Sequence, residues 1–226
     1  MDALTNPIWE SLRTALSRFA EVSGPARRFL PKVTRLAGFR EPSSEAFEGL
    51  ARLQSDGMPS ALFLERPVDV PAGWRVIETD LLLQMVHQRD VELPAPPENM
   101  ITLGPQDTAE MIDLVKLTKP GPFGSRTQEL GIYLGVRREG KLAAMAGERL
   151  RVAGHAEVSA VCRHPDFLGR GLAGGLMAAV MRRMREKNET PFLHVRADNT
   201  RAIKLYKRLG FEESRRFHLL VVAPLR

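Results

Sequence analysis

EVSAVCRHPDFLGRGLAGGLM, residues 157–177, is the stretch of the chain that decides the fold. It places a strand-like run before the glycines Gly169, Gly171 and Gly174, and a helix-like run after them. Glycines ahead of a helix let consecutive backbone N–H groups converge on a phosphate, and the helix dipole adds a favourable field. The stretch therefore predicts a strand, a phosphate-binding loop and a helix, with Arg170 as a possible charge contact.

The same glycines also match the Gly-x-Gly-x-x-Gly pattern of dinucleotide-binding folds. In those folds the strand runs almost directly into the first glycine, because the turn must be tight. Here the strand ends near Arg163, and HPDFL intervenes before Gly169. Too few strand–helix units follow for that fold, so the pattern disfavours a dehydrogenase. A plain loop leading into a helix, with Gly174 and Gly175 packed closely on a sheet, is the structural alternative.

The chain from Met100 onward alternates strand and helix signals. The turn sequences REGK and VAGH join three of the strands into a predicted antiparallel meander. We therefore expect an α/β fold with a mixed sheet and helices on both faces. Strands are predicted at 100–104, 131–138, 141–152, 155–163, 191–197 and 217–225, and helices at 107–119, 173–187 and 199–210.

The proline-rich stretch VELPAPPENM, residues 91–100, predicts a boundary, because it cannot continue a helix. We expect an N-terminal α/β region at 1–93 and a second domain at 98–226. The first region has a short amphipathic helix within residues 1–20, strand-like runs at 60–66 and 73–79, and a helix-like run at 80–88. It is either a separate module or a cover packed on the second domain. The cover is favoured, since some ninety residues bury only a thin core alone.

Composition excludes several classes of function. The net charge of +6 allows an anionic ligand, but the basic clusters match no nucleic-acid-binding motif, so no nucleic-acid partner is expected. Five scattered histidines without partners at ligand spacing predict no metal site. The single cysteine, Cys162, together with the lack of a long apolar run or a signal-peptide core, predicts a cytoplasmic protein with no membrane partner. The oligomeric state stays open.

A second motif, NTRAIKLYKRLGF at residues 199–211, follows the glycine loop. Together with EVSAVCRHPDFLGRGLAGGLM it resembles the GNAT-type N-acetyltransferase superfamily, specifically its FR47-like branch. The family pattern is a strand, a proline, Arg/Gln-x-x-Gly-x-Gly/Ala, and later Asn-x-x-Ala-x-x-Leu-Tyr-x-x-x-Gly-Phe. The later motif is matched at every position, whereas Leu168 stands where the family usually has Arg or Gln. The resemblance covers the chain from about Met100 to its end.

The resemblance implies a GNAT-like acyl-CoA transferase fold with an N-terminal α/β extension, which could be a degenerate GNAT-like half. No Gly-x-Gly occurs in that extension, so no second cofactor site is expected. Acetyl-CoA is the implied co-substrate, bound where two central parallel strands splay apart. The residues implied for its binding are Val161, Cys162 and Arg163 on the strand, Leu168, Gly169, Arg170, Gly171, Leu172, Ala173 and Gly174 at the loop and helix start, and Asn199.

Acetyl transfer to an amine needs a base for the amine and an acid for the departing thiolate. The resemblance implies Tyr206 as the general acid, and a buried aromatic residue is its structural alternative. Glu157 is the candidate base, acting directly or through water, and a surface ion pair with Arg149 or Arg151 is its alternative. Strand alternation puts Glu157 on one face with Val161 and Arg163, and points Cys162 away as a core residue.

These observations predict an acetyl-CoA-dependent N-acetyltransferase that works by direct attack in a ternary complex. The acceptor, a small-molecule or peptide amine, is not named by the sequence. A non-catalytic acyl-CoA-binding regulatory module is the alternative from another class, supported by Leu168. A transferase that uses a longer acyl-CoA is the alternative among enzymes.

Overall fold

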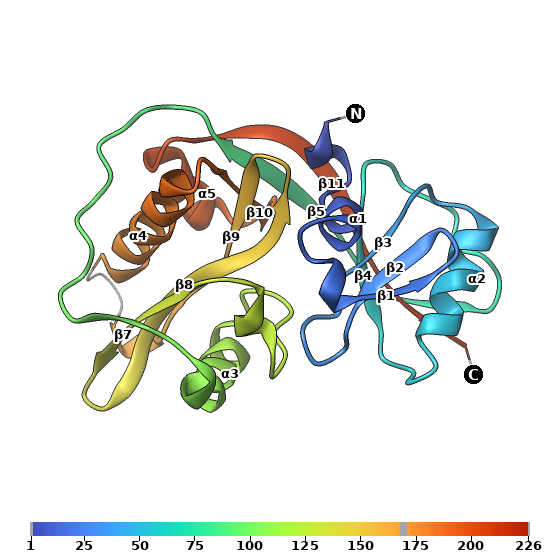
Figure 1. The fold of residues 1–226 in the computed structure, drawn as a ribbon, viewed down its shortest axis with the longest axis horizontal. Helices are drawn as coiled ribbons and strands as arrows, with labels where there is room; N and C mark the ends of the chain where they lie inside the picture. The colour runs from blue at the N-terminus through green and yellow to red at the C-terminus, as the bar shows by residue number, and fades with distance from the viewer. Residues whose placement is uncertain (1, 168–170, 226) are drawn as a thin grey trace.

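The computed structural model describes residues 2–167 and 171–225 (Figure 1). Its main feature is an eight-stranded mixed sheet in the order β4-β11-β5-β10-β9-β8-β7-β6. A second, three-stranded antiparallel sheet has the order β1-β2-β3. The strands are β1 (Ala20–Ser23), β2 (Ala26–Phe29), β3 (Ala37–Phe39), β4 (Ser60–Leu64), β5 (Trp74–His87), β6 (Met100–Thr102), β7 (Tyr133–Arg138), β8 (Lys141–Val152), β9 (His155–Arg163), β10 (Thr190–Arg196) and β11 (Phe211–Pro224).

Helices cover both faces of the large sheet, as the sequence predicts. The α-helices are α1 (Pro7–Arg13), α2 (Ser44–Leu53), α3 (Thr108–Thr118), α4 (Leu172–Glu186) and α5 (Thr200–Arg208). Short 3-10 helices lie at Ala3–Thr5, Ser17–Phe19, Pro105–Asp107, Thr127–Leu130 and Pro165–Phe167. The apolar stripe of α4 packs with one set of residues from β7, β8 and β9, and α3 packs with the alternate set, so the two helices lie on opposite faces. The α/β class with a mixed sheet is confirmed.

The run DLLLQMVHQ, predicted as a helix at 80–88, is instead the second half of β5. Leu82 and Val86 face one core cluster, whereas Leu83 and Met85 face another, which is the period of a strand buried on both sides. β5 pairs with β11 along its whole length and with β10 from Leu82 to Val86. A short apolar run fits a buried helix or a buried strand equally well, and here the neighbouring strands decide.

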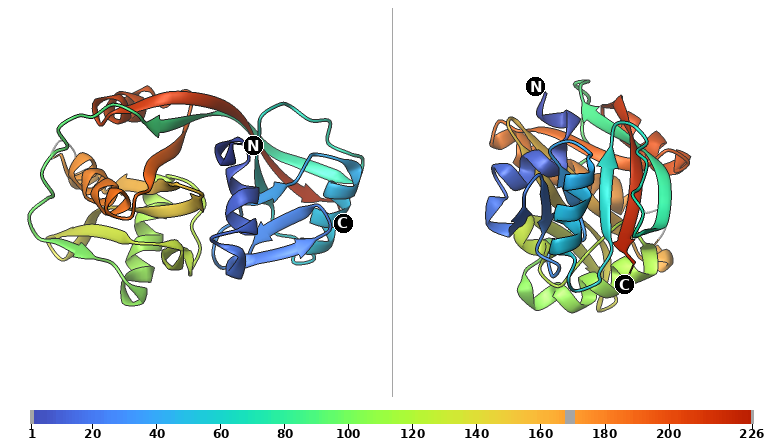
Figure 2. Two further views of the ribbon diagram at one scale, coloured as in Figure 1. Left: turned by 45° about the horizontal axis from the view of Figure 1, so that its top comes forward. Right: turned by 90° about the vertical axis from the view of Figure 1, so that its right-hand side faces the viewer.

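β5 and β11 extend together across the molecule and carry both of its halves (Figure 2). At one end of this ribbon lie α4, α5 and the meander β7-β8-β9, and at the other lie α2 and the small sheet (Figures 1 and 2). The meander has the antiparallel pairing that the turn sequences predict. Strands on both sides of the proline-rich stretch thus share one sheet.

The proline-rich stretch itself lies against α4. A Cβ atom added at Gly175 would come within 3.0 Å of the carbonyl oxygen of Ala95 and the ring of Pro97. Arg182 also donates hydrogen bonds from Nη2 to the carbonyl oxygens of Leu93 (2.8 Å) and Pro94 (2.9 Å). Gly175 is therefore needed because the chain crosses the helix at close range.

Candidate active site

β9 and β10 separate in the middle of the sheet. They form a parallel pair only at Thr190–His155, Pro191–Ala156 and Phe192–Glu157. Beyond Phe192, β10 continues along β5, and the residues of β9 after Glu157 have no pairing with it. One edge of β9, from Val158 to Arg163, is therefore left with backbone groups that no described strand uses. Val161, Cys162 and Arg163 all lie on this segment.

A β-bulge in β9 overturns the predicted alternation. Gly147 of β8 pairs with Ser159, but Met145 pairs with Cys162, so β9 contains one extra residue between these pairs. Ala160 in the bulge has a φ of 52°, a conformation that is uncommon outside glycine. After the bulge the faces exchange: Cys162 packs under α3, whereas Val161 packs on the α4 side with Val158.

Two predictions about β9 change as a result. Val161 lies on the opposite face of β9 from Glu157, and Cys162 lies on the same face as Glu157. The reason is that the extra residue shifts the alternation by one. Cys162 is buried all the same, and burial raises the pKa of its thiol to about 12. A thiol that stays protonated is a poor nucleophile, so the packing role predicted for Cys162 is the one its surroundings favour.

The N-terminus of α4 lies after the glycine loop. Gly171 is the N-cap residue with a φ of 68°, and no side chain within the described residues caps the helix there. A Cβ atom added at Gly171 would meet no atom of the described residues within 4 Å. The amides of Leu172, Ala173 and Gly174 form the first turn, where backbone N–H groups lack partners within the helix. Leu168, Gly169 and Arg170 lie outside the described residues.

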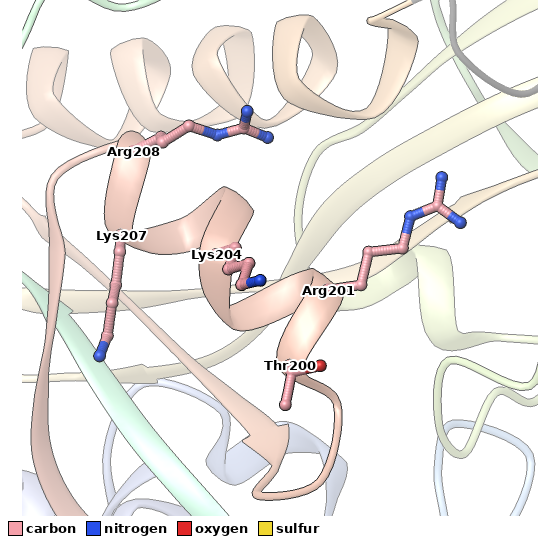
Figure 3. Close-up of a pocket in the computed structure, with 5 residues that line it drawn as sticks. All are labelled: Thr200, Arg201, Lys204, Lys207 and Arg208. Carbon is pink, nitrogen blue, oxygen red and sulfur yellow. The ribbon is translucent and has the colours of Figure 1, made fainter.

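Helix α5 adds a strongly basic surface. Its N-cap is Asn199, whose side chain accepts a hydrogen bond from the amide of Ala202 at 3.1 Å. An open depression of about 530 Å³ runs along the exposed side of the helix (Figure 3). It is lined by Thr200, Arg201, Lys204, Lys207 and Arg208.

Two arginines approach each other where α5 begins and β9 ends. Burial, and then the positive charge of Arg201, lower the pKa of Arg163. Neither arginine takes part in an ion pair among the residues that the structure describes. Figure 3 shows Arg201 and Arg208 extending from α5 in a similar direction, whereas Lys207 points away from them. Cations left without carboxylate partners favour an anionic ligand at this place.

Tyr206 lies on α5 and is partly buried against the core cluster of α4. Its ring meets that of Phe211 edge-on, at a centroid distance of 6.3 Å. Burial raises the pKa of Tyr206 to about 12, so the hydroxyl keeps its proton at neutral pH. A protonated hydroxyl is what a general acid requires, and the ring packing shows that Tyr206 also contributes to the core.

Glu157 is fully buried in a network that joins three strands. Arg149 of β8 donates to both of its oxygens, at 2.8 and 2.7 Å, and Nδ1 of His194 on β10 lies 2.7 Å from Oε1. Burial opposes ionisation, but the charge and hydrogen bonds of Arg149, with that of His194, lower the pKa of Glu157 to about 2. The ion pair with Arg149 is thus present, in the interior rather than at the surface.

Sequence reasoning missed His194 and Tyr133 as neighbours of Glu157. His194 is 37 residues away from Glu157 along the chain and comes close because β9 and β10 pair in parallel. No spacing rule reveals such a contact, since it depends on strand order. Among the described residues, no cluster of three or more His, Cys, Asp or Glu side chains is arranged to hold a metal ion. None of the described helices is long and apolar enough to span a membrane.

The strand separation, the open N-terminus of α4 and the fold around them define the class of protein as an acetyltransferase of the GNAT type. The pattern of the FR47-like protein family matches residues 133–219. A solved structure from Novosphingobium aromaticivorans, assigned to the GNAT family of acetyltransferases, is 38% identical, with a TM-score of 0.89 and 99% of each chain covered. The chain belongs to the GNAT family of acetyltransferases.

A more distant solved structure has a similar fold, and two curated relatives match part of the sequence. A GCN5-related N-acetyltransferase from Kribbella flavida is 17% identical, with a TM-score of 0.61 over 93% of this chain and 92% of that one. Mycothiol acetyltransferase of Corynebacterium aurimucosum is 48% identical over 56 residues, which are 24% of this chain and 18% of that protein. Mycothiol acetyltransferase of Saccharopolyspora erythraea is 38% identical over 82 residues, 36% of this chain and 27% of that protein. The matches to these curated relatives span less than a third of their length.

Proposed function

We propose that the protein transfers the acetyl group of acetyl-CoA to an amine acceptor by direct attack in a ternary complex. The observation that carries this proposal is the separation of β9 from β10 next to the N-terminus of α4. The unused edge of β9 offers backbone hydrogen bonds to the pantetheine arm and the thioester carbonyl. The amides of the first turn of α4 suit a pyrophosphate, which a helix N-terminus attracts.

The basic residues of α5 support the same ligand. CoA carries phosphates, and Arg163 and Arg201 supply cations where β9 ends and α5 begins, while Arg208 lines the same depression as Arg201. Asn199 starts α5 at this point. Because its side-chain oxygen caps the helix, the amide nitrogen is the group of Asn199 that we assign to the cofactor.

The chemical step forms a C–N bond and breaks a C–S bond. The neutral amine attacks the thioester carbonyl, the C–S bond breaks, and the thiolate takes a proton from the hydroxyl of Tyr206. The nitrogen, now bonded to the acetyl group, loses its extra proton to solvent, and solvent returns a proton to Tyr206. Glu157 is a less suitable base than the sequence alone suggests, since both of its oxygens are occupied and its pKa is lowered to about 2. We therefore propose that Glu157 positions Arg149.

The test is acetyl-CoA turnover with pools of amines, read as released CoA thiol, beside acetyl-CoA binding measured by calorimetry. We expect binding, and CoA release that depends on at least one pool. Binding without release from any pool would favour a regulatory module that binds acyl-CoA. Absence of binding would contradict the proposal altogether.

A further inference from the structure

The guanidinium of Arg149 is fixed by Glu157 through two of its nitrogens, and its third nitrogen, Nη1, is left without a partner among the described residues. Its side chain is only 8% exposed, and Nε and Nη2 both donate to Glu157, which fixes the plane of the guanidinium. Nη1 makes no hydrogen bond within the described residues. It lies on the side of Gly121, where an added Cβ atom would be 3.7 Å away. A guanidinium has five N–H donors, so the Glu157 contact leaves donors that can bind a ligand.

The free side of Arg149 lines a narrow pocket. The loop Pro120–Phe123 forms one wall, and Tyr133, Ser159 and Ala160 form the others. The cavity volume is about 10 Å³, which is room for one water-sized group such as a single oxygen atom. Ser159 and Ala160 lie at the bulge of β9, beside the strand edge that we assign to the thioester.

Tyr133 provides an independent sign of a missing ligand. Its side chain is 1% exposed, and its hydroxyl is buried without a hydrogen-bond partner among the described residues. Burial raises the pKa of this hydroxyl well above its usual range, so it stays protonated and is able to donate. An unpaired buried hydroxyl is destabilising, and a ligand oxygen that accepts its hydrogen bond would remove that cost.

We infer that this pocket receives one carboxylate oxygen of the acceptor, and that the protein acetylates amines with a carboxylate close to the nitrogen, as in free amino acids. This inference rests on the proposed function and names its acceptor class. Arg149, Tyr133 and Ser159 all offer donors to the same small space, which suits one negatively charged oxygen, and the second carboxylate oxygen stays outside the pocket. A primary amide fits less well, since its oxygen is neutral and gains less from the guanidinium of Arg149.

The experiment compares each of the common amino acids with its own primary amide, using the full chain, acetyl-CoA and CoA release. For every acceptor used, we expect kcat/KM to be at least tenfold higher for the acid. Tyr133→Phe and Ser159→Ala each remove a single hydroxyl, and should raise KM for the acid while leaving the amide nearly unchanged. Ser214→Ala, at an exposed serine of β11, is the control and should change neither.

A binding arm separates this inference from the proposed function. Calorimetry with an N-acetylated amino acid and its amide reports on the pocket without any turnover, and acetyl-CoA binding is measured in parallel. Tighter binding of the acid, lost in Tyr133→Phe, supports the carboxylate pocket even if no acetyl transfer occurs. Equal or tighter binding of the amide, or an amide used as well as its acid, would overturn the inference while leaving acetyl transfer in place.

Discussion

The oxygens of Glu157 accept hydrogen bonds from Arg149 and contact His194. The contacts on the two sides of the His194 ring determine which of its nitrogens carries the proton. The amide nitrogen of Gln84 lies 3.3 Å from Nε2 of His194 and also donates to the carbonyl oxygen of Leu4. An amide donor at Nε2 requires that nitrogen to accept, so the proton of the neutral ring lies on Nδ1 and is donated to Glu157. Burial, the largest influence, lowers the pKa of His194 and favours this neutral form.

This buried network predicts that the protein is less stable in acid. An unfolded chain protonates histidine below about pH 6.5, whereas folded His194 resists protonation, so the free energy of unfolding should fall as the pH drops below that value. Glu157 adds a further loss as the pH falls from 4.5 to about 2, because folding holds its pKa down. Urea unfolding at several pH values measures both effects.

His194→Gln is the matched control for the first of these losses, since glutamine does not titrate. The variant should show a flatter stability profile between pH 7 and 5 than the parent. An identical slope in the two proteins would mean that His194 does not couple protonation to folding.

Tyr206 yields a prediction about catalysis. Tyr206→Phe removes only the hydroxyl and retains the edge-on contact with Phe211. We expect acetyl-CoA affinity to be unchanged and turnover to fall by about 10²–10⁴, the usual contribution of a positioned acid. Calorimetry and steady-state kinetics test this, with the chemical step shown to limit the rate. Unchanged kcat would leave Tyr206 with its packing role alone.

The sequence alone offers candidate residues where a linear motif carries them. Tyr206 was named in this way, and the ion pair of Glu157 with Arg149 was named as an alternative and is present. The unpaired hydroxyl of Tyr133 and the contact of His194 were not named, because each depends on strands that meet only after folding.

At the scale of elements, the N-terminus of α4 is the feature most directly open to test. Gly171 has a positive φ, and no atom of the described residues lies where its side chain would be, so we expect a side chain there to project toward the assigned pyrophosphate. Gly171→Asp should weaken acetyl-CoA binding at least tenfold, about 1.4 kcal/mol, through charge repulsion. Calorimetry measures the change.

Gly171→Asn is the matched control, because it has nearly the same shape as aspartate and tolerates this backbone conformation. It should lose much less affinity than the aspartate variant. Equal losses in both variants would assign the effect to shape, and unchanged affinity in both would place the phosphates elsewhere.

The elements of the second half were largely predictable, whereas the second half of β5 was wrongly predicted. The apolar stripe of α4 and the turns of the meander are local signals, so they survive without knowledge of the neighbours. The local sequence of residues 80–88 predicts a helix. The run is a strand in the structure because it pairs with β10 and β11 on its two sides. The bulge at Ala160 left no signal either, since alanine is not a residue that prefers a positive φ.

The whole molecule shares a core across the proline-rich stretch. Ile8 and Leu12 of α1 pack in one cluster with Leu150, Val152 and Phe192. The hydroxyl of Ser11 also accepts a hydrogen bond from the amide of Arg151 at 3.1 Å. These contacts support our proposal that residues 1–93 form a cover on residues 98–226 and do not act as an independent module.

A fragment that begins at Glu98 tests the cover. It lacks β4 and β5, so β10 and β11 lose the strand that lies between them. We expect the fragment to be poorly soluble, or to lose amine selectivity while it keeps the cofactor loop. Expression yield, calorimetric unfolding and the amine panel measure this. A fragment that expresses well with full activity and unchanged acceptor choice would show that the cover proposal is wrong.

The position of β11 in the sheet has a consequence for how the chain is made. β11 lies between β4 and β5 in the sheet, and β5, the later of the two, leaves the ribosome about 120 residues before it. At a synthesis rate of about 5–20 residues per second, their edges stay unpaired for roughly 6 to 25 s. Open strand edges are where nascent chains associate wrongly. Chaperones that hold strand edges should therefore engage this chain during its synthesis and release it only after its last strand emerges.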